Sequence, residues 1–500
     1  MIPLYALLII TILFFLGFGL TYLLLPKNVK KYSFWLIPWF GIIISILFLV
    51  ILSFLGIPVK ISAFFLIFFC LIINIFVFLK KRKLILIGDL KENFLILLLI
   101  IGSIFFLLRP LIKDLNYPTA ISFGNNDITA YVVGSDYLMD NSIQKAFYDR
   151  KAKSANDILL GPYRFGPTAL YSFFSYIFGF KPYQITYILQ AAIFPLAAPL
   201  IYILIKILYK KTYIGLLLSF FITVFNANLL YMFYHNFFPH TIFRGLTCFI
   251  LIFLLLYIHK INEKRKTLIN KFNFIISLGF TAILFSYQEA VVTFFLIPLG
   301  FYAVTISLMN KKINCLSKLL KTGFITVIIG LPSVIYSFRF LSYLIPATLN
   351  KNAFIGWQLL RDKIPYANPF EALGFYSIHH FPPMPNLLAI SLSLAVLGVI
   401  IIGIFRSKFK IFLSIFIFYY ILIFIKSWII IPNFFDYARA VSYVLPIFII
   451  TFSIGFSFCF EKFKLLCFVP LVILLSLVLF SAKKLDTRFF YGRFSVDKGY

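Results

Sequence analysis

The sequence predicts an all-α protein, a polytopic bundle of about fourteen transmembrane helices, and three observations carry this prediction. Of the 500 residues, 62% are hydrophobic and only 12% are charged, whereas a soluble globular protein is about a quarter charged. The hydrophobic residues form runs of about 20, the length that crosses the hydrocarbon core of a bilayer. Every second break between these runs is rich in Lys and Arg. The composition excludes a soluble enzyme, a disordered protein and a nucleic-acid-binding domain.

Each apolar run long enough to cross the membrane is expected to form one helix. We expect the first run to be retained, because its positive charges follow it, whereas a cleavable signal peptide carries them in front. A tight outward hairpin is expected where Tyr287, Gln288 and Glu289 interrupt a continuous apolar stretch. The expected spans are 4–25, 34–55, 61–79, 94–112, 184–205, 213–231, 241–258, 273–287, 290–309, 322–341, 386–405, 411–431, 440–460 and 465–481.

The formal net charge of +30 is concentrated in the breaks between spans. Seven basic breaks hold 25 of the 46 Lys and Arg residues, and the positive-inside rule places such breaks in the cytoplasm. Both termini are then on the outer face, although the basic tail 482–500 fits the rule worst and leaves an odd number of spans open. The positive charge therefore indicates the membrane topology and does not indicate a nucleic-acid-binding surface. The seven breaks are 27–33, 80–92, 206–212, 259–272, 310–321, 406–410 and 461–464.

The acidic residues are distributed unevenly across this topology. Of the 16 Asp and Glu residues, four fall on the cytoplasmic side and the other twelve face outward. Acidic residues contribute little to orientation, so this bias is expected to serve chemistry. Two outward loops, 113–183 and 342–385, are long enough to carry function. The first loop holds Asp114, Asp127, Asp136, Asp140, Asp149 and Asp157.

The first long loop is expected to contain short helices along the membrane surface. Asn125 or Asn126 is suited to cap a helix through 127–139, because a short polar side chain satisfies the first backbone N–H groups. The segment 163–179 is aromatic and is predicted to form an amphipathic helix that re-enters the membrane.

Six charged residues lie within or beside the predicted spans, all near the outward end. Charges at membrane depth are costly and are functional candidates, although long cationic side chains also extend to the interface without any other role. As a set they predict a water-filled cavity that opens outward and suits an anionic lipid head group with a hydroxyl-bearing partner. The six are Arg109, Arg244, Glu289, Arg339, Lys426 and Arg439.

Three motifs occur in a fixed order along the chain. An acidic patch, Gly124–Asp127, is followed by Tyr131, and Tyr163–Pro167 then leads into a predicted helix. Asp436–Arg439 opens a late span that contains Pro446. In this order and sidedness the sequence resembles the GT-C superfamily of integral membrane glycosyltransferases. In many members the acidic loop follows the first span, whereas here three more spans precede it.

The resemblance implies a single integral membrane domain with a GT-C-like core at 94–481, a three-span prefix at 1–93 and a tail at 482–500. It also implies a site on the outer face of the cell membrane. The donor would be a polyprenyl-phosphate sugar, and the acceptor a glycan, lipid or protein of the cell envelope.

Sugar transfer from a phosphate needs a base for the acceptor hydroxyl and positive charge for the departing phosphate. We expect Asp127 to be the base, with Asp136 and Asp140 as alternatives. The competing interpretation of Asp127 is helix capping, because acidic residues stabilise helix N-termini without any catalytic role.

Arg439 is the first candidate for the lipid phosphate, since a guanidinium binds two phosphate oxygens at once. Arg244 and Lys426 are second-rank candidates. Glu289 is a candidate second acid that binds the acceptor or a metal. The competing interpretations are an ion pair between Arg439 and Asp436 and a polar turn at Glu289.

No cofactor is firmly predicted. A divalent cation stays open, because four outward-facing histidines together with a carboxylate provide ligands, but interfacial hydrogen bonding is the stronger expectation. The five cysteines include no C-x-x-C pair, so neither a disulfide framework nor a zinc site is predicted. The aromatic segment 369–385 is expected to stack on a sugar, to cover the cavity, or to form part of an aromatic belt. The four histidines are His235, His240, His379 and His380.

Two other functions stay open beside sugar transfer. One is a polymerase or ligase of lipid-linked polysaccharides, which performs related chemistry on a different donor. The other is a non-enzymatic flippase or transporter of lipid-linked saccharides, which requires alternating access. The expected partners are the lipid-linked donor, the acceptor and the membrane lipids, with no nucleic acid.

Overall fold

The computed structural model describes eleven stretches of the chain, and all statements below concern these. Every regular element within them is a helix, which confirms the all-α prediction. A helix satisfies its backbone hydrogen bonds internally, as a chain surrounded by lipid must. The described residues are 1–80, 89–115, 118–119, 127–148, 164–258, 270–310, 314–338, 342, 369–376, 386–425 and 434–497.

Within the described stretches, nine helices are long and apolar enough to cross a membrane. Two bent helix pairs, with bends of 41° and 95°, raise the number to eleven if each pair is one span. The chain is therefore a multi-pass membrane protein, while the count of fourteen spans stays a prediction. The nine helices are Ile2–Leu24, Lys27–Phe54, Val59–Lys80, Leu90–Lys113, Pro182–Leu208, Phe238–Ile258, Leu387–Arg406, Leu445–Lys462 and Lys464–Lys483. The bent pairs are Tyr213–Val224 with Ala227–Tyr234 (41°) and Cys315–Ile329 with Leu331–Phe338 (95°).

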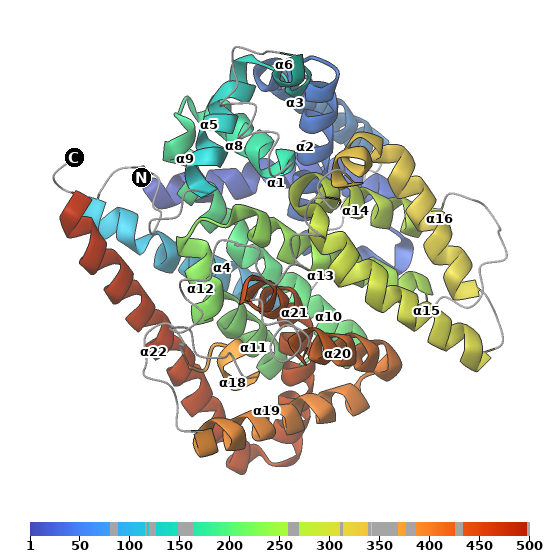
Figure 1. The fold of residues 1–500 in the computed structure, drawn as a ribbon, viewed down its shortest axis with the longest axis vertical. Coiled ribbons are helices and arrows are strands. Elements are labelled where there is room, and N and C mark those ends of the chain that lie inside the picture. Colours follow the sequence, from blue (N-terminus) through green and yellow to red (C-terminus); the bar gives the residue numbers. More distant parts are fainter. Residues whose placement is uncertain are drawn as a thin grey trace. The chain divides into compact units, whose positions relative to one another are not determined.

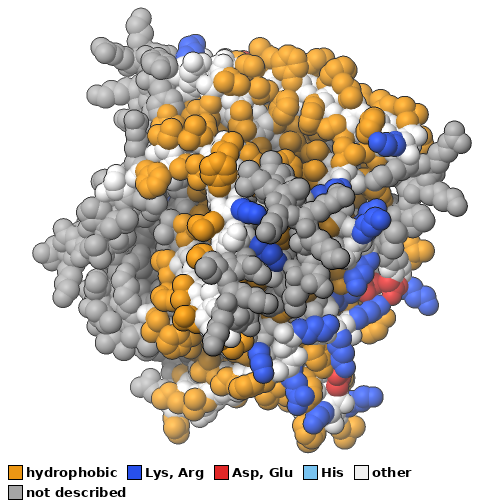
Figure 2. All heavy atoms as spheres, turned by 90° about the vertical axis from the view of Figure 1, so that its right-hand side faces the viewer, with side chains coloured by type: hydrophobic (Ala, Val, Ile, Leu, Met, Phe, Trp, Pro, Cys, Tyr) orange, Lys and Arg blue, Asp and Glu red, His pale blue; other side chains and the backbone are white. Residues whose placement is uncertain are grey.

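Much of the surface is hydrophobic (orange in Figure 2). On helix α3 (Val59–Lys80), Phe64, Phe68, Phe78 and Leu79 are each more than half exposed. A contiguous apolar face of this kind is unfavourable in water. It is expected where a helix contacts lipid tails.

The chain divides into two compact units. The first comprises Met1–Leu200, His235–Val292 and Ile306–Phe340, and the second comprises Ile201–Tyr234, Thr293–Thr305 and Leu341–Tyr500. The predicted prefix 1–93 stays a prediction, and its three helices lie in the first unit. Helices of the first unit are α1 (Ile2–Leu24), α2 (Ser33–Phe54), α3, α4 (Leu90–Pro110), α5 (Asp127–Asp140), α6 (Ile143–Tyr148), α8 (Phe165–Phe178), α9 (Pro182–Ile193), α13 (Phe238–Ile258), α14 (Lys271–Ala290) and α16 (Asn314–Ile329).

The second unit is also helical throughout its described residues, and a few elements cross the boundary between the units. Helices of the second unit are α11 (Tyr213–Val224), α12 (Ala227–Tyr234), α18 (Pro369–Ala372), α19 (Asn386–Arg406), α20 (Lys410–Ile425), α21 (Phe434–Lys462) and α22 (Lys464–Asp497). The boundary elements are α10 (Ala197–Leu208), the π-helical turn η5 (Val291–Leu296) and α15 (Ile297–Asn310). Three short turns complete the first unit: η1 (Lys27–Tyr32), η2 (Leu111–Leu115) and η4 (Phe194–Leu196).

Helix α8 lies at the centre of the first unit, packed against α2, α5, α9 and α14 (Figure 1). The helices predicted at 127–139 and 163–179 are present as α5 and α8. However, all eleven residues from Phe165 to Ser175 are buried. The amphipathic segment expected from the sequence is therefore a core helix, because neighbours cover every side of it. The proposed caps Asn125 and Asn126 lie outside the described residues.

At the hairpin predicted at 287–289, the structure has a kink at Tyr287 and no loop. Helix α14 continues to Ala290, the π-helical turn η5 follows directly, and α15 begins at Ile297. Only Tyr287 leaves the helical conformation, with φ −159° and ψ 70°. The polar residues there interrupt the hydropathy pattern without adding a loop.

In each unit, basic breaks predicted to lie on one side of the membrane meet at one end. In the first unit, Lys271 donates to the carbonyl of Leu23 at 2.6 Å, and Lys318 donates to that of Tyr257 at 2.8 Å. In the second, Lys210 pairs with Glu461 at 2.7 Å. We call the end of the first unit that carries Lys271 and Lys318 its Lys-rich end.

We call the opposite end of the first unit its α5 end. Aromatic contacts join the ends of several helices there. Phe54, at the end of α2, packs against Phe165, Phe285 and Tyr336. The start of α8 and the end of α14 therefore meet at the end of α2. Asp127 and Asp136 belong to this end through α5.

Glycines allow two pairs of helices to touch backbone to backbone. A Cβ on Gly17 would collide with the carbonyl oxygen of Ile37, and one on Gly41 with that of Leu13, so α1 and α2 cross in contact. In the second unit, Gly403 and Gly455 do the same for α19 and α21. Small residues at crossings are typical of membrane helices, where close packing replaces the hydrophobic effect.

We predict that Gly41→Ala destabilises the protein by about 1–3 kcal/mol, the usual cost of overpacking. The measurement is the temperature at which half of the detergent-solubilised protein stays monodisperse. Gly102→Ala is the matched control, because nothing lies within 4 Å of a Cβ at that helical position. Equal melting temperatures for the two variants would contradict the crossing.

Candidate functional site

The start of α8 lies directly against the end of α14. A Cβ on Gly166 would meet Ser286 Oγ at 2.5 Å and the carbonyl oxygen of Phe285 at 3.2 Å. Glycine therefore lets the first turn of α8 approach the α14 backbone. This approach brings Arg164, the residue before α8, to Tyr287 at the kink of α14.

Arg164 is the centre of a group of polar and aromatic side chains from four helices. Its guanidinium carbon lies 4.6 Å from the centroid of the Tyr287 ring, and its Nη1 donates to Tyr131 Oη at 3.2 Å. Tyr287 Oη and His240 Nε2 are 3.0 Å apart in a hydrogen bond. We call Tyr131, Arg164, His240 and Tyr287 the Arg164 cluster. Tyr131 and Tyr287 are buried, whereas Arg164 and His240 are half-buried.

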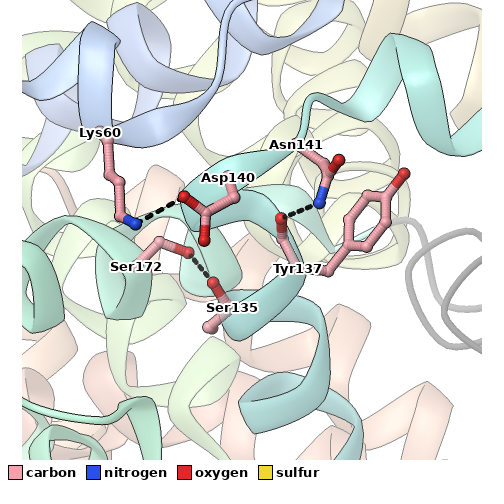
Figure 3. Close-up of polar contacts among 6 residues, drawn as sticks. All are labelled: Lys60, Ser135, Tyr137, Asp140, Asn141 and Ser172. Carbon is pink, nitrogen blue, oxygen red and sulfur yellow. Dashed lines mark hydrogen bonds and ion pairs between the residues drawn. The ribbon is translucent and has the colours of Figure 1, made fainter.

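Helix α5 is fixed to α8 by hydroxyl groups. Ser135 Oγ donates to the carbonyl of Thr168 at 3.0 Å. Ser172 Oγ donates to the carbonyl of Ser135 at 2.7 Å, as Figure 3 shows. These bonds lie on the buried side of α5, which also carries Tyr131. They hold the Tyr131 hydroxyl beside Arg164.

The two later acids of α5 lie on its exposed side. Asp140 forms an ion pair with Lys60 of α3, as Figure 3 shows. Asp136 is exposed. Among the acids proposed as the base, Asp136 and Asp140 are therefore separated by the body of α5 from the side that carries Tyr131.

The remaining predicted site residues fall partly outside the described residues. Asp127 opens α5 one helical turn before Tyr131, and Glu289 lies in α14 two residues after Tyr287. Arg439 lies in α21 of the second unit. The side chains of these three residues are not described, nor is any part of Lys426, Asp149, Asp157, His379 and His380. The structure thus places the backbones of two predicted acids next to the Arg164 cluster.

Arg244 is buried, with 3% of its surface exposed. Its guanidinium lies 4.2 Å from the centroid of the Phe194 ring, and Nη2 lies 3.5 Å from the Phe194 carbonyl oxygen. The turn η4, which contains Pro195, interrupts the span there, and Trp39 Nε1 donates to the carbonyl of Leu196 at 3.1 Å. Neighbouring side chains often satisfy such carbonyls in membrane helices. Arg244 therefore has structural contacts that the sequence did not indicate.

Part of the predicted aromatic segment 369–385 is buried in the second unit. Phe375 is 1% exposed and lies 5.4 Å from Phe452 between ring centroids. Asn226, at the bend between α11 and α12, donates to the carbonyl of Ala372 at 2.9 Å. Phe375 is therefore packed in the protein and does not stack on a sugar. Residues 377–385 are outside the described residues.

No group of three His, Cys, Asp or Glu side chains suited to hold a metal ion occurs in the described part of the chain. His235 is buried, and His240 bonds to Tyr287. The divalent cation stays a prediction.

Comparison with known proteins does not assign the chain to a family. No family model matches the sequence, and no curated protein matches it. The GT-C resemblance therefore stays a prediction that depends on the motifs and their order.

The sequence pattern did not single out Arg164 or Tyr287 as site residues. Charges within the spans are the ones that hydropathy marks, and Arg164 precedes a helix that the sequence predicted to be amphipathic and to re-enter the membrane. A usable signal is present in Arg164–Pro167, where a cation directly precedes a helix whose first turn contains Gly-Pro. Tyr287 stands out in the sequence only as a break in hydropathy.

We predict that Arg244→Met leaves the melting temperature in detergent within a few degrees of the wild type or raises it. The change removes a charge whose burial is costly. It loses the contact with the Phe194 ring and a hydrogen bond at 3.5 Å, the weak limit of such bonds.

Trp39→Phe is the comparison for this prediction. It leaves the buried Leu196 carbonyl without its 3.1 Å partner, which costs about 1–3 kcal/mol. A larger loss of stability in Arg244→Met than in Trp39→Phe would show that the Arg244 contacts hold the fold together.

Proposed function

We propose that the protein is a membrane glycosyltransferase that moves a sugar from a polyprenyl-phosphate donor to a cell-envelope acceptor on the outer face. The observation that carries this proposal is the Arg164 cluster. It gathers a cation, two tyrosine hydroxyls and an imidazole at the α5 end of the first unit, where α5 begins with Asp127.

The chemistry of sugar transfer suits this arrangement. The departing lipid phosphate needs positive charge, and the acceptor hydroxyl needs a base. In the proposal Asp127 is the base and Arg439 binds the phosphate, with Arg244, Lys426 and Glu289 in supporting roles. Asp136 ranks below Asp127 as a candidate for the base, because it is exposed on the side of α5 away from Tyr131.

The proposed sidedness follows from the charges at the two ends of the first unit. The basic breaks meet at the Lys-rich end, and the positive-inside rule assigns such an end to the cytoplasm. The α5 end then faces outward, where a flipped lipid-linked sugar is available. A polymerase or ligase that uses a lipid-linked oligosaccharide would have the same requirements.

A flippase is the second candidate, favoured by the interrupted spans. Two helix pairs are bent by 41° and 95°, and the span Pro182–Leu208 contains the turn η4. Discontinuous helices are common in transporters. Translocation of a lipid-linked saccharide in vesicles without any sugar transfer would support this candidate and contradict the proposal.

We predict that Asp127→Asn lowers the rate of sugar transfer by about 100-fold or more, the usual contribution of a general base. The assay uses membranes supplied with labelled polyprenyl-phosphate sugar. Arg439→Ala is expected to lower the rate as well, through loss of phosphate binding.

Asp136→Asn is the matched control, because it makes the same change on the exposed side of the same helix. It should keep wild-type activity. Full activity in Asp127→Asn, or equal losses in both variants at equal expression, would remove Asp127 as the base.

A further inference from the structure

Three basic connections between helices of the second unit meet at one end of that unit. The backbone N–H of Lys408 donates to the carbonyl of Leu208 at 2.8 Å, and Lys210 pairs with Glu461 at 2.7 Å. The first contact joins the connection 406–410 to 206–212, and the second joins 206–212 to 461–464. We call the cations of these connections the basic surface of the second unit. They are Lys206, Lys210, Lys211, Arg406, Lys408, Lys410, Lys462 and Lys464.

The positive charge of this surface has little acidic compensation within the three connections. Their only acid is Glu461. It already pairs with Lys210, and Tyr209 Oη donates to the same carboxylate at 3.0 Å. A basic surface with a single, occupied carboxylate attracts anions.

Two cations of the basic surface share one aromatic ring. The guanidinium carbon of Arg406, at the end of α19, lies 3.9 Å from the ring centroid of Phe458 in α21. The Nζ atom of Lys462, at the end of α21, lies 5.2 Å from the same centroid. Cation–π contacts thus hold two charges of the same sign near one another.

No carboxylate separates these two charges. Both side chains are exposed, and within the described stretches neither Arg406 nor Lys462 forms an ion pair with an acid. Like charges at such a separation repel one another, and an anion bound beside both would remove the repulsion. The positive-inside rule requires basic connections on the cytoplasmic side, but it does not require cations from different connections to share a ring.

Large apolar side chains lie directly beside the cations in the chain. Phe405 is 72% exposed, Phe463 is 54% exposed, and Leu465 is 91% exposed. They precede or follow Arg406, Lys462 and Lys464. Exposed apolar groups of this size are unfavourable in water and are expected where lipid tails begin. A ligand that fits this combination has an anionic head and an apolar tail, as a phospholipid has, whereas a soluble acidic protein would match only the charge.

We propose that the basic surface of the second unit binds the phosphate of an anionic phospholipid, with Arg406 and Lys462 as the central contacts. Basic residues next to membrane spans attract the anionic lipids of the cytoplasmic leaflet, and the positive-inside rule assigns these connections to that leaflet. Binding of this lipid does not require sugar transfer, so it is tested separately from the proposed function.

The test exposes the full-length protein, in a neutral detergent, to equal amounts of phosphatidylglycerol and phosphatidylcholine. Native mass spectrometry then counts the bound molecules of each lipid. The wild type is expected to bind phosphatidylglycerol in preference. The double variant Arg406→Gln with Lys462→Gln should lower the ratio of bound phosphatidylglycerol to phosphatidylcholine about threefold or more, because each cation at the membrane surface adds to the attraction.

Two controls separate this site from net charge and from damage to the fold. Lys145→Gln with Lys181→Gln removes two exposed lysines from the predicted outward loop 113–183 and should keep the wild-type ratio. Arg406→Lys with Lys462→Arg exchanges the two cations without changing the charge and should also keep the preference for phosphatidylglycerol.

Each remaining outcome overturns the proposal. A wild type without preference would mean that the surface does not select anionic lipid and fits an acidic protein better. Equal losses in the double variants of Arg406 with Lys462 and of Lys145 with Lys181 would mean that only net charge matters. Loss of the preference in the exchanged variant would mean that damage to the fold, and not removal of charge, lowers binding.

Two further arms test the source of the phosphate and the fold of the variants. Inorganic phosphate is added as a competitor, and displacement of phosphatidylglycerol at comparable concentration would overturn the lipid assignment. Elution from a size-exclusion column checks the fold of each variant. If Arg406→Gln with Lys462→Gln elutes as aggregate, Lys408→Gln with Lys464→Gln replaces it, because it removes two exposed cations of the same surface and leaves the Phe458 contacts intact. The same loss of preference is expected.

Discussion

The structure depends on one constraint, that hydrocarbon supplies no hydrogen bonds to an interrupted helix. At three breaks in the described part of the chain, polar side chains lie beside the interruption. Trp39 and Arg244 meet the carbonyls beside Pro195, and Asn226 accepts from the N–H of Asn228 at 2.8 Å at the bend before α12. At the kink of α14, Tyr287 bonds to His240. Polar groups thus gather at these three breaks, and the Arg164 cluster forms at one of them.

Close approach of helices positions these groups. Gly17 and Gly41 allow α1 and α2 to cross in backbone contact, and Gly166 allows the start of α8 to reach the end of α14. The second contact sets Arg164 on the Tyr287 ring. A side chain at position 166 would separate the two helices, so the arrangement of the candidate site follows from packing as much as from its polar residues.

The sequence was sufficient for properties that depend on composition along the chain. Apolar runs predicted the helices from α1 to α4 within a few residues of their observed ends, because a helix must span a fixed thickness. The alternation of basic breaks predicted which ends of each unit meet, as the contacts of Lys271 and Lys210 confirm. The helix at 127–139 was predicted from the capping residues that precede it, and α5 (Asp127–Asp140) confirms it.

The failures concern properties that depend on neighbours in space. Burial of α8 follows from the helices around it, and no periodicity of its own sequence reports them. The polar triplet at 287–289 marks the kink at Tyr287 but does not report that the chain stays helical up to Ala290. Arg244 is a candidate by its charge, yet its contacts with Phe194 follow from a break in another span. The Arg164 cluster combines four helices, so its members have no common motif.

The central claim is that the α5 end of the first unit faces outward and the Lys-rich end faces the cytoplasm. It is tested most directly by labelling intact cells with a membrane-impermeant maleimide, in a chain whose five cysteines are replaced. Gln144→Cys, exposed on α6, and Asn28→Cys, exposed between α1 and α2, report the two ends. We predict labelling of Gln144→Cys in intact cells and of Asn28→Cys only after permeabilisation. The reverse pattern would contradict the account.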